Sequence, residues 1–560
     1  MNGFYVTTAI PYVNAAPHLG HALELVQADV LARHRRRRGQ PVRLLTGTDE
    51  NALKNVTAAR AAGVAVPEFV AAGADRFAAL RGPLSLSFDD FIRTSADPRH
   101  RRGVELLWRR CAPDLYRRRY EGRYCAGCEQ FYAPAELVAG RCPEHGTEPE
   151  HIAEENWFFR LSRYGDAIEE AIVSGRVRIE PETRRNEVLA FVRSGLADIS
   201  VSRPAARAGG WGIPVPDDPE QVVYVWWDAL ANYITPLTGD ELDEWWLRSA
   251  ERVHVVGKGI VRFHAVHWLA LLTAVGLPLP TAIFVHPYLT IGGSKIAKSA
   301  GTGVDPLELV ARFGVDAVRW WLLREASGRS DTDFTVARLV DRADRELAGG
   351  LGNLVQRLVV LAHRIGDGRL ARGTPGEATA AATALPGRID AALARFDLRG
   401  ATAAIWSFVE VANRVLERER PWERTAADRE GVLAGLVDAC RITVGECLPF
   451  LPDGAAELLA RLGAGDAVGP AGAVFRRLGP VAEPARVEAE PEGTRPRPRA
   501  WTSPVHGAAH GGLHQPQAKR LTTVSVEGHP RGRGHPGGPV GRENTGEQSG
   551  QGGDEDDGAQ

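Results

Sequence analysis

The sequence predicts an α/β protein in which a Rossmann-like parallel sheet is followed by an all-α bundle. Residues 3–10 form an apolar, β-branched run suited to a buried strand, residues 18–38 have helical spacing, and residues 41–46 suit a second strand. A strand, a helix and a strand in this order begin a doubly wound nucleotide-binding sheet. From about residue 345 to 475 apolar residues recur every three or four positions, which indicates packed helices.

Later segments extend and interrupt this pattern. Residues 222–226, 252–257 and 282–291 are predicted to be further strands of the same kind, with helical segments between them. Residues 117–170 are rich in aromatic residues, cysteine and charge. They are therefore predicted to be an insertion rather than another layer of the sheet.

Length and composition indicate a globular protein. A chain of 560 residues has room for roughly three or four domains. Hydrophobic residues make up 44% and charged residues 25%, and no apolar run approaches the roughly 20 residues that span a bilayer. The first residues lack the basic and then apolar order of a signal peptide. We therefore expect a cytoplasmic protein without a membrane segment.

The formal net charge of −2 argues against a generally basic RNA-binding protein. Two local basic runs, residues 34–38 and 117–119, are either RNA-binding patches or solvated surfaces, and the sequence does not decide between these. Residues 479–560 are rich in Pro, Gly, Arg, His, Gln and Glu, a composition that predicts disorder because too little apolar surface could be buried.

A metal site is predicted in the insertion. Cys125 and Cys128 form a C-x2-C pair, and thirteen residues later Cys142 and His145 form a C-x2-H pair. Three thiolates and one imidazole complete the tetrahedral shell of a structural Zn²⁺. Since no position is left open for water, the ion would be structural rather than catalytic.

Two further motifs suit phosphate chemistry. His18-Leu19-Gly20-His21 stands where a strand gives way to a helix, and helix N-termini favour phosphate groups. Taken alone, an H-x-x-H pair is more often two ordinary surface histidines or a metal pair. Residues 292–299 place Lys295, Lys298 and Ser299 after two glycines, and lysines supply point charge to a polyphosphate. Taken alone, this segment would be a solvated loop.

Together the two motifs, HLGH and KIAKS, resemble the paired signatures of class I aminoacyl-tRNA synthetases. The blocks TAIPYVN (8–14), TGTDE (46–50), VYVW (223–226) and DALANY (228–233) resemble the methionyl-tRNA synthetase family in particular, as do residues 257–268. The cysteine pattern is similar to the single zinc knuckle of one branch of that family. The resemblance covers about residues 3–478.

This resemblance implies a function and a set of site residues. The chain would join methionine to tRNA(Met) using ATP with Mg²⁺, and His18, His21, Lys295 and Lys298 would be catalytic. The ATP site would add Gly20, Gly257 and Ser299, and Asp49 would hold the methionine α-ammonium group. The methionine side chain would lie among Ile10, Tyr12, Trp226, Ala229, Leu230, Tyr233, Ile260, His264 and Trp268. The anticodon would be read by Asn353, Arg357 and Trp422.

The implied architecture is a class I Rossmann-like catalytic domain with a zinc-binding insertion, followed by an α-helical anticodon-binding bundle. The expected segments are a catalytic first half (1–116), the insertion (117–170), a catalytic second half (171–300), a connector (301–345), the anticodon-binding domain (346–478) and the tail (479–560). No further dimerising module is recognisable, so a monomer is expected.

Three positions depart from the family pattern. Gly259 replaces an aspartate expected to bond the ATP ribose, Asn51-Ala52 replaces a His-Gly pair, and Ala297 replaces a serine in the lysine loop. The alternatives to an active methionyl enzyme are another class I synthetase, a stand-alone amino-acid activator that does not charge tRNA, and a catalytically silent tRNA-binding paralogue. The insertion is too small for the editing domain of the branched-chain enzymes, and the histidines and lysines of both motifs are present.

Overall fold

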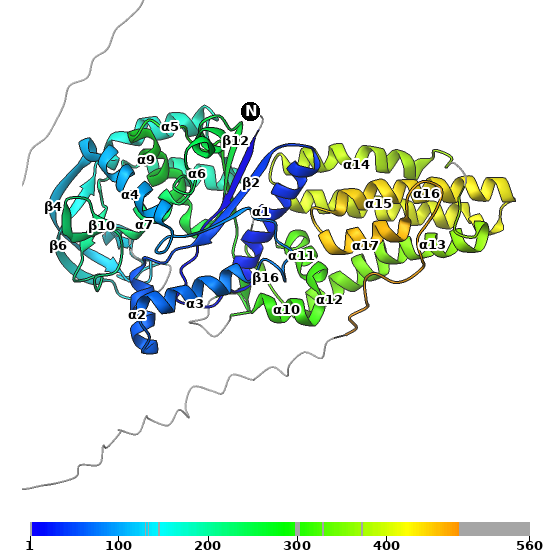
Figure 1. Ribbon diagram of the computed structural model, residues 1–560, viewed down its shortest axis with the longest axis horizontal. Helices are drawn as coiled ribbons and strands as arrows, with labels where there is room; N and C mark the ends of the chain where they lie inside the picture. Colours follow the sequence, from blue (N-terminus) through cyan, green and yellow to red (C-terminus); the bar gives the residue numbers. More distant parts are fainter. Residues whose placement is uncertain are drawn as a thin grey trace, which may run out of the picture. The chain divides into compact units, whose positions relative to one another are not determined.

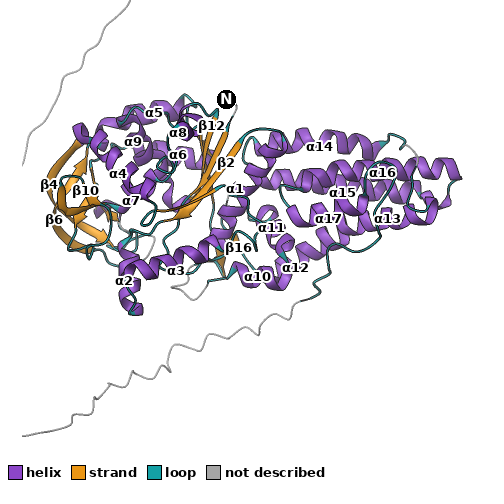
Figure 2. Cartoon of the chain, viewed as in Figure 1, coloured by secondary structure: helices purple, strands orange, loops and turns teal. Residues whose placement is uncertain are grey.

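The computed structural model describes residues 3–480 except 129, 133, 144–145, 297–302, 327–329 and 371–372. Its central sheet has six parallel strands in the order β3-β2-β1-β12-β13-β7. Strands β2 and β12 of this sheet are labelled in Figures 1 and 2. The strands are β1 (Phe4–Thr8), β2 (Val42–Thr48), β3 (Asp90–Arg93), β7 (Arg178–Glu180), β12 (Glu251–Gly257) and β13 (Ala282–His286). This confirms the predicted parallel α/β sheet.

The strand order places a switch point between β1 and β12. Going outward from β1, the chain adds β2 and β3 on one side and β12 and β13 on the other. Ligands of open α/β sheets bind in the crevice outside the carboxyl ends of the strands at such a point. The loops after Thr8, Thr48 and Gly257 are therefore where a site is expected.

Helices of the catalytic half connect and cover these strands. They are α1 (Leu19–Arg37), α2 (Leu53–Ala62), α3 (Val66–Ala78), α4 (Pro98–Arg110), α5 (Gly165–Val173), α6 (Glu182–Arg193), α7 (Val225–Ala231), α8 (Asp240–Leu242) and α9 (Trp268–Ala274). Helix α1 packs on β1 and β2, and its Leu19, Leu23 and Val26 are fully buried. The buried residues include the uninterrupted run Val26–Ala32, so this helix is covered on more than one face.

The insertion forms a separate antiparallel sheet in the order β5-β4-β6-β8. Its strands are β4 (Leu115–Cys125), β5 (Gln130–Tyr132), β6 (Glu150–Phe159) and β8 (Ile199–Ser200). A second antiparallel sheet contains β9 (Ser202–Pro204), β10 (Pro214–Val215) and β11 (Asp218–Val223). The prediction that 222–226 belongs to the parallel sheet is wrong, because a short apolar run does not reveal its pairing partner.

The C-terminal part is helical, as predicted. It comprises α10 (Pro306–Phe313), α11 (Val315–Arg324), α12 (Val336–Arg342), a π-helix (Ala343–Gly352), α13 (Asn353–Gly366), α14 (Glu377–Leu393), α15 (Leu398–Glu419), α16 (Ala426–Cys447) and α17 (Pro452–Leu462). Helices α13 to α17 lie side by side (Figure 1). Among the described helices, none has both the length and the apolar character needed to cross a membrane. The tail from 481 lies outside the described residues.

The basic run 34–38 at the end of α1 is a structural clamp. Arg37 and Arg38 both pair with Glu446 of α16, and His34 and Arg38 contact Asp390 of α14. Arg35 pairs with Glu251 and Arg36 with Asp89. Because each of the five side chains contacts a carboxylate, the run joins α1 to its neighbours. The second basic run differs, since Arg117, Arg118 and Arg119 are exposed on β4.

Candidate active site

Helix α1 begins with two histidines bonded to its own backbone. His18 is the N-cap, and its Nδ1 accepts from the Gly20 amide at 3.1 Å, while His21 Nδ1 accepts from the His18 amide at 3.1 Å. The two rings stack with centroids 3.7 Å apart. Since both Nδ1 atoms accept, a neutral ring carries its proton on Nε2. Burial first, and then His18 and His286, hold the pKa of His21 well below its usual value.

Gly20 is required by this arrangement. A Cβ at position 20 would lie 2.9 Å from Cε1 and 3.0 Å from Nδ1 of His18. Any larger residue would therefore displace the imidazole that caps the helix. Gly20, which the family resemblance places in the ATP site, therefore also makes room for the His18 ring.

An aromatic wall follows the carboxyl ends of β1 and β2. Asp49, only 2% exposed, donates its backbone amide to Pro11 O at 2.9 Å, which holds the two strand ends together. The Tyr12 and Trp226 rings meet edge to face at 6.4 Å, and Trp226 stacks on Phe263 at 3.6 Å. Trp226 stands in α7, so two strand ends and a helix from distant parts of the sequence meet at one place.

The imidazole of His264, which follows Phe263 of this wall, is held in one protonation state. His264 Nδ1 lies 2.9 Å from Ile260 O, which can only accept, so Nδ1 carries a proton. Burial lowers the pKa of His264 to about 4, so the ring is neutral at pH 7. Its Nε2 then accepts the hydroxyl hydrogen of Tyr233, 2.6 Å away. Tyr233, His264 and Trp268 are buried, as are Ala229 and Leu230, while Ile10 and Ile260 are partly buried.

His254 is a residue of this cluster that the sequence reasoning missed. Trp268 Nε1 donates to His254 Nε2 at 3.1 Å, and His254 Nδ1 lies 2.7 Å from Thr7 Oγ1. The His254 ring is fully buried, and it lies 4.2 Å from the Tyr233 ring. A histidine between Val253 and Val255 in a strand of a parallel sheet was the available signal, because such a strand is buried on both faces.

The lysine loop begins with a turn held by an aspartate. Gly292 and Gly293 have φ of +57° and +79° between β14 (Leu289–Ile291) and β15 (Ser294–Lys295). Asp333, in β16 (Thr332–Asp333), accepts from the Gly293 amide at 3.0 Å and from Thr290 Oγ1 at 2.8 Å. Ala297, Lys298 and Ser299 lie outside the described residues, as does the side chain of Lys295.

Two of the three family departures can be placed. Asn51 Nδ2 donates to Asp228 Oδ2 at 2.9 Å, so this side chain is hydrogen-bonded within the protein. Gly259 lies in the short 3-10 helix Lys258–Ile260 that follows Gly257 and β12. Lys258, the first residue of this helix, pairs through its Nζ with Asp331 Oδ2 at 2.7 Å. Ala297 is outside the described residues.

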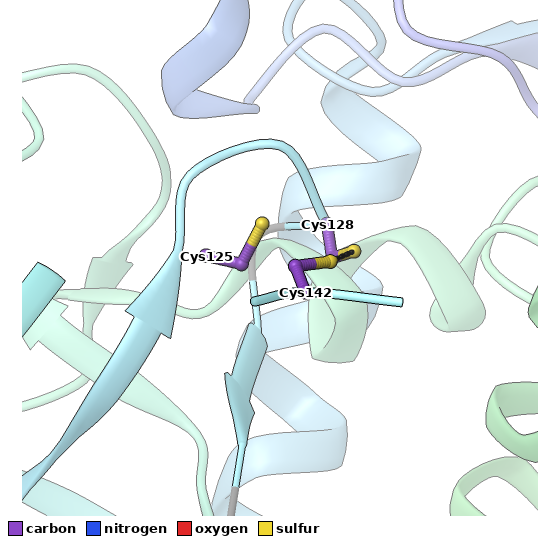
Figure 3. Close-up of side chains that lie close together, drawn as sticks. All are labelled: Cys125, Cys128 and Cys142. Carbon is purple, nitrogen blue, oxygen red and sulfur yellow. Dashed lines mark hydrogen bonds between the residues drawn. The ribbon is translucent and has the colours of Figure 1, made fainter. Parts of the chain in front are cut away.

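Three cysteines of the insertion form a candidate metal site. The Sγ atoms of Cys125, Cys128 and Cys142 all lie within 4.8 Å of one another (Figure 3), and Cys125 and Cys142 are buried. Sulfur ligands of a tetrahedral Zn²⁺ stand about 3.8 Å apart, so the arrangement fits this ion. The Tyr132 hydroxyl donates to Cys128 Sγ at 3.0 Å. His145 lies outside the described residues.

The expected anticodon residues stand on the helical bundle. Asn353 begins α13 and is exposed, and Arg357 follows one turn later. Arg357 Nη2 pairs with Glu417 Oε1 of α15 at 2.5 Å. Trp422 is 40% exposed in the 3-10 helix Pro421–Glu423 that follows α15. An exposed tryptophan ring can stack an unpaired base.

Known proteins with this sequence and structure are synthetases. A family model described as tRNA synthetases class I (M) matches residues 4–150 and 145–359. The methionine–tRNA ligase of Mycobacterium tuberculosis is 40% identical over 488 residues, which cover 83% of this chain and 92% of that protein. The methionine–tRNA ligase of Caldanaerobacter subterraneus is 38% identical over 82% of this chain and 74% of that protein.

Solved structures agree with the sequence comparison. The M. tuberculosis methionyl-tRNA synthetase in complex with methionyl-adenylate matches with a TM-score of 0.80 at 37% identity, covering 85% of this chain and 100% of that one. The apo form of the same enzyme matches with a TM-score of 0.74. The chain therefore belongs to the methionyl-tRNA synthetase family of class I tRNA synthetases.

Proposed function

We propose that this protein is a methionine–tRNA ligase. The observation that carries the proposal is the buried aromatic and histidine cluster between β1, α7 and α9, which adjoins the strand ends at the switch point of the sheet. A relative with 37% identity has been solved with methionyl-adenylate. Methionine and ATP are accordingly the substrates, and methionyl-adenylate is the intermediate.

The first step joins methionine to AMP. The methionine carboxylate, already ionised at neutral pH, attacks the α-phosphorus of ATP, and the bond to the bridging oxygen breaks to release pyrophosphate. No general base is needed, so catalysis is positioning and stabilisation of charge on the phosphates. We assign this work to His18 and His21 at the N-terminus of α1 and to Lys295 and Lys298 of the loop. Gly20, Gly257 and Ser299 complete the ATP site, and Mg²⁺ accompanies ATP.

Methionine is selected by the uncharged side chains that line its proposed pocket. Ile10, Tyr12, Trp226 and the Tyr233–His264 pair supply apolar edges that suit a polarizable thioether. Asp49 takes the α-ammonium group at the other end. An apolar pocket alone discriminates by only about 1–3 kcal/mol per methylene, so the fixed hydroxyl and imidazole add selectivity. A tRNA ribose hydroxyl then attacks the methionyl carbonyl and releases AMP.

Pyrophosphate exchange measured with each common amino acid tests this function. Pyrophosphate exchange should depend on methionine. The same enzyme preparation should also charge tRNA(Met) with methionine. Equal or faster exchange with leucine or isoleucine would contradict the methionine assignment. An absence of exchange with every amino acid, combined with retained tRNA binding, would favour a silent paralogue.

The cysteine cluster is proposed to hold one structural Zn²⁺, with His145 as the fourth ligand. When bound, the ion supplies folding stability to the insertion, because the ligands lie on separate short segments. Elemental analysis of protein purified without added metal should give one zinc per chain. A metal-free preparation that is folded and fully active would contradict the site.

Anticodon reading is proposed for Asn353, Arg357 and Trp422. Stacking of a base on an aromatic ring is worth about 1–3 kcal/mol, so Trp422→Ala should lower charging efficiency roughly tenfold or more. Pyrophosphate exchange without tRNA should be unchanged, because Trp422 stands on the helical bundle. A parallel loss of exchange and charging would assign Trp422 to the packing of the bundle instead.

A further inference from the structure

A buried carboxylate stands inside the helix that forms the aromatic wall. Asp228, in α7, is fully buried and follows Trp226 by two residues. His100 of α4 contacts its Oδ1 through Nε2 at 2.9 Å, and Asn51 donates to its Oδ2 at 2.9 Å. Because an isolated buried carboxylate is strongly unfavourable, these two donors are needed to keep α7 in place.

The network also connects segments that are distant in sequence. His100 Nδ1 lies 2.8 Å from the hydroxyl of Thr235, which follows α7, and the Asn51 amide also reaches Thr94 O at 3.4 Å. Asn51 stands two residues after Asp49 in the segment after β2. The Asn51–Asp228 hydrogen bond is therefore a direct connection between the segment carrying Asp49 and the helix carrying Trp226.

We infer that Asn51, acting through Asp228, is a positioning residue that sets the length of amino acid the pocket accepts. The inference rests on the proposed function, in which Asp49 holds the ammonium group and α7 lines the side-chain end. These two ends must stand a fixed distance apart to accept one side-chain length. The hydrogen bond from Asn51 to Asp228 fixes that distance, so both side chains act through protein contacts.

The negative charge of the Asp228 carboxylate explains why an amide suits position 51. The Asp228 carboxylate already accepts from His100 and has one oxygen left for a second donor. The Asn51 side chain provides an N–H without adding a charge. An isosteric carboxylate at this position would remove the donor and place a second negative charge beside the first, which pushes the two segments apart.

Two variants test the inference. Asn51→Asp keeps the shape and removes the donor, whereas Asn51→His offers a different donor to the same oxygen. The matched control is Asn413→Ala in α15, which removes an amide of similar burial that bonds to the Val409 carbonyl within its own helix. Pyrophosphate exchange gives KM for methionine, KM for ATP and kcat, and parallel assays with ethionine measure the acceptance of one extra methylene.

For Asn51→Asp we expect KM for methionine to rise about tenfold or more, as for the loss of one hydrogen bond to a charged group. The preference for methionine over ethionine should fall, while KM for ATP stays within about twofold. Asn51→His should recover most of both losses, and Asn413→Ala should behave like the wild type. An unchanged KM for methionine in Asn51→Asp would overturn the inference.

Two other outcomes are separable from this one. If Asn51→Asp lowers the melting temperature and changes kcat and both KM values together, Asn51 is merely structural and the inference fails. If the wild-type protein shows no methionine-dependent exchange, the proposed function itself fails, whatever the variants do.

Discussion

Helix α1 carries basic residues at both ends, and the two ends use them in opposite ways. At its N-terminus His18 and His21 bond to the helix's own backbone and stack on each other. At its C-terminus the side chains of residues 34–38 each contact a carboxylate, among them Glu446 and Asp390. At the N-terminus these residues bond to the backbone of α1 itself, whereas at the C-terminus they bond to carboxylates of other segments.

The helix dipole explains the difference. Cations near a helix C-terminus are stabilising, so the clamp at residues 34–38 gains stability from its position. Cationic residues near the N-terminus are unfavourable, and anions are favoured there instead. Basic residues at a helix C-terminus therefore suggest structure, whereas histidines at an N-terminus suggest a site for phosphate.

The largest expected effect comes from the N-terminal end. His21→Ala should lower the rate of adenylate formation by about 100-fold or more, the loss typical of removing one preorganised donor from a charged transition state. The free energy of unfolding should change by no more than about 1 kcal/mol, since the variant loses one capping hydrogen bond. Stopped-flow measurement of adenylate formation and thermal unfolding together separate the two quantities.

A matched variant controls for the cap. His21→Asn keeps a side-chain oxygen able to accept from the His18 amide, so its stability should match the wild type while its rate remains low. If the rate of adenylate formation were normal in His21→Asn, the role of His21 would be capping alone, and the contrast between the two helix ends would disappear.

A substitution at the C-terminal end of α1 should affect stability rather than the rate of adenylate formation. Glu446→Gln weakens the contacts to Arg37 Nε at 3.2 Å and Arg38 Nη2 at 2.6 Å. Hydrogen bonds to charged groups are worth about 1.5–3 kcal/mol, so we expect the free energy of unfolding to fall by about 1–3 kcal/mol. The exchange rate per folded molecule should not change.

The exposed pair Arg109–Asp217 gives the control for this variant. Its two side chains are 58% and 78% exposed, so Asp217→Asn should leave the denaturation midpoint where it is. A large loss of exchange activity in folded Glu446→Gln protein would show that the clamp also positions the active site. The two ends of α1 would then not divide stability and catalysis between them.

The parallel sheet, the helical bundle and the grouping of three cysteines follow from sequence patterns. The spacing of apolar residues predicts α1, and C-x2-C spacing predicts that the thiols meet. The partners of His34, Arg37 and Arg38 could not be predicted, because Asp390 and Glu446 are more than 350 positions away in the chain. The same holds for Asn51, whose partner Asp228 approaches it only through the packing of α7.

The smallest expected effect concerns pH and the histidine of the clamp. His34 Nε2 contacts Asp390 Oδ1 at 3.1 Å, while burial, followed by the charge of Arg38, lowers the pKa of His34 to about 4. Asp390 and Glu446 act in the opposite direction, and Arg35 adds to the lowering. The ring is therefore neutral at pH 7 and donates to Asp390 without a charge of its own.

The direction of the pH effect follows from the two states. The pKa of an unfolded histidine is about 6.5, so between pH 6.5 and 4 the unfolded chain binds a proton that the folded chain does not. The free energy of unfolding should then fall as the pH falls through this window, and be independent of His34 above it. His264 and His267, whose pKa values are also lowered to about 4, contribute in the same window. The pKa values of His21 and His254 are lowered too, so these residues act in the same direction below pH 6.5.

His34→Asn isolates the contribution of this one residue, because the amide keeps an N–H for Asp390 and cannot be protonated. The loss of stability between pH 7.5 and 5.5, measured by urea unfolding, should be smaller in the variant by about 1 kcal/mol. Asn413→Ala supplies the control, because it replaces one uncharged side chain by another and should leave the pH dependence as it is in the wild type. An unchanged pH dependence in His34→Asn would mean that folding does not shift the pKa of His34. The clamp would then leave its histidine free to become charged below about pH 6.5, and the two ends of α1 would differ in how they treat the imidazole.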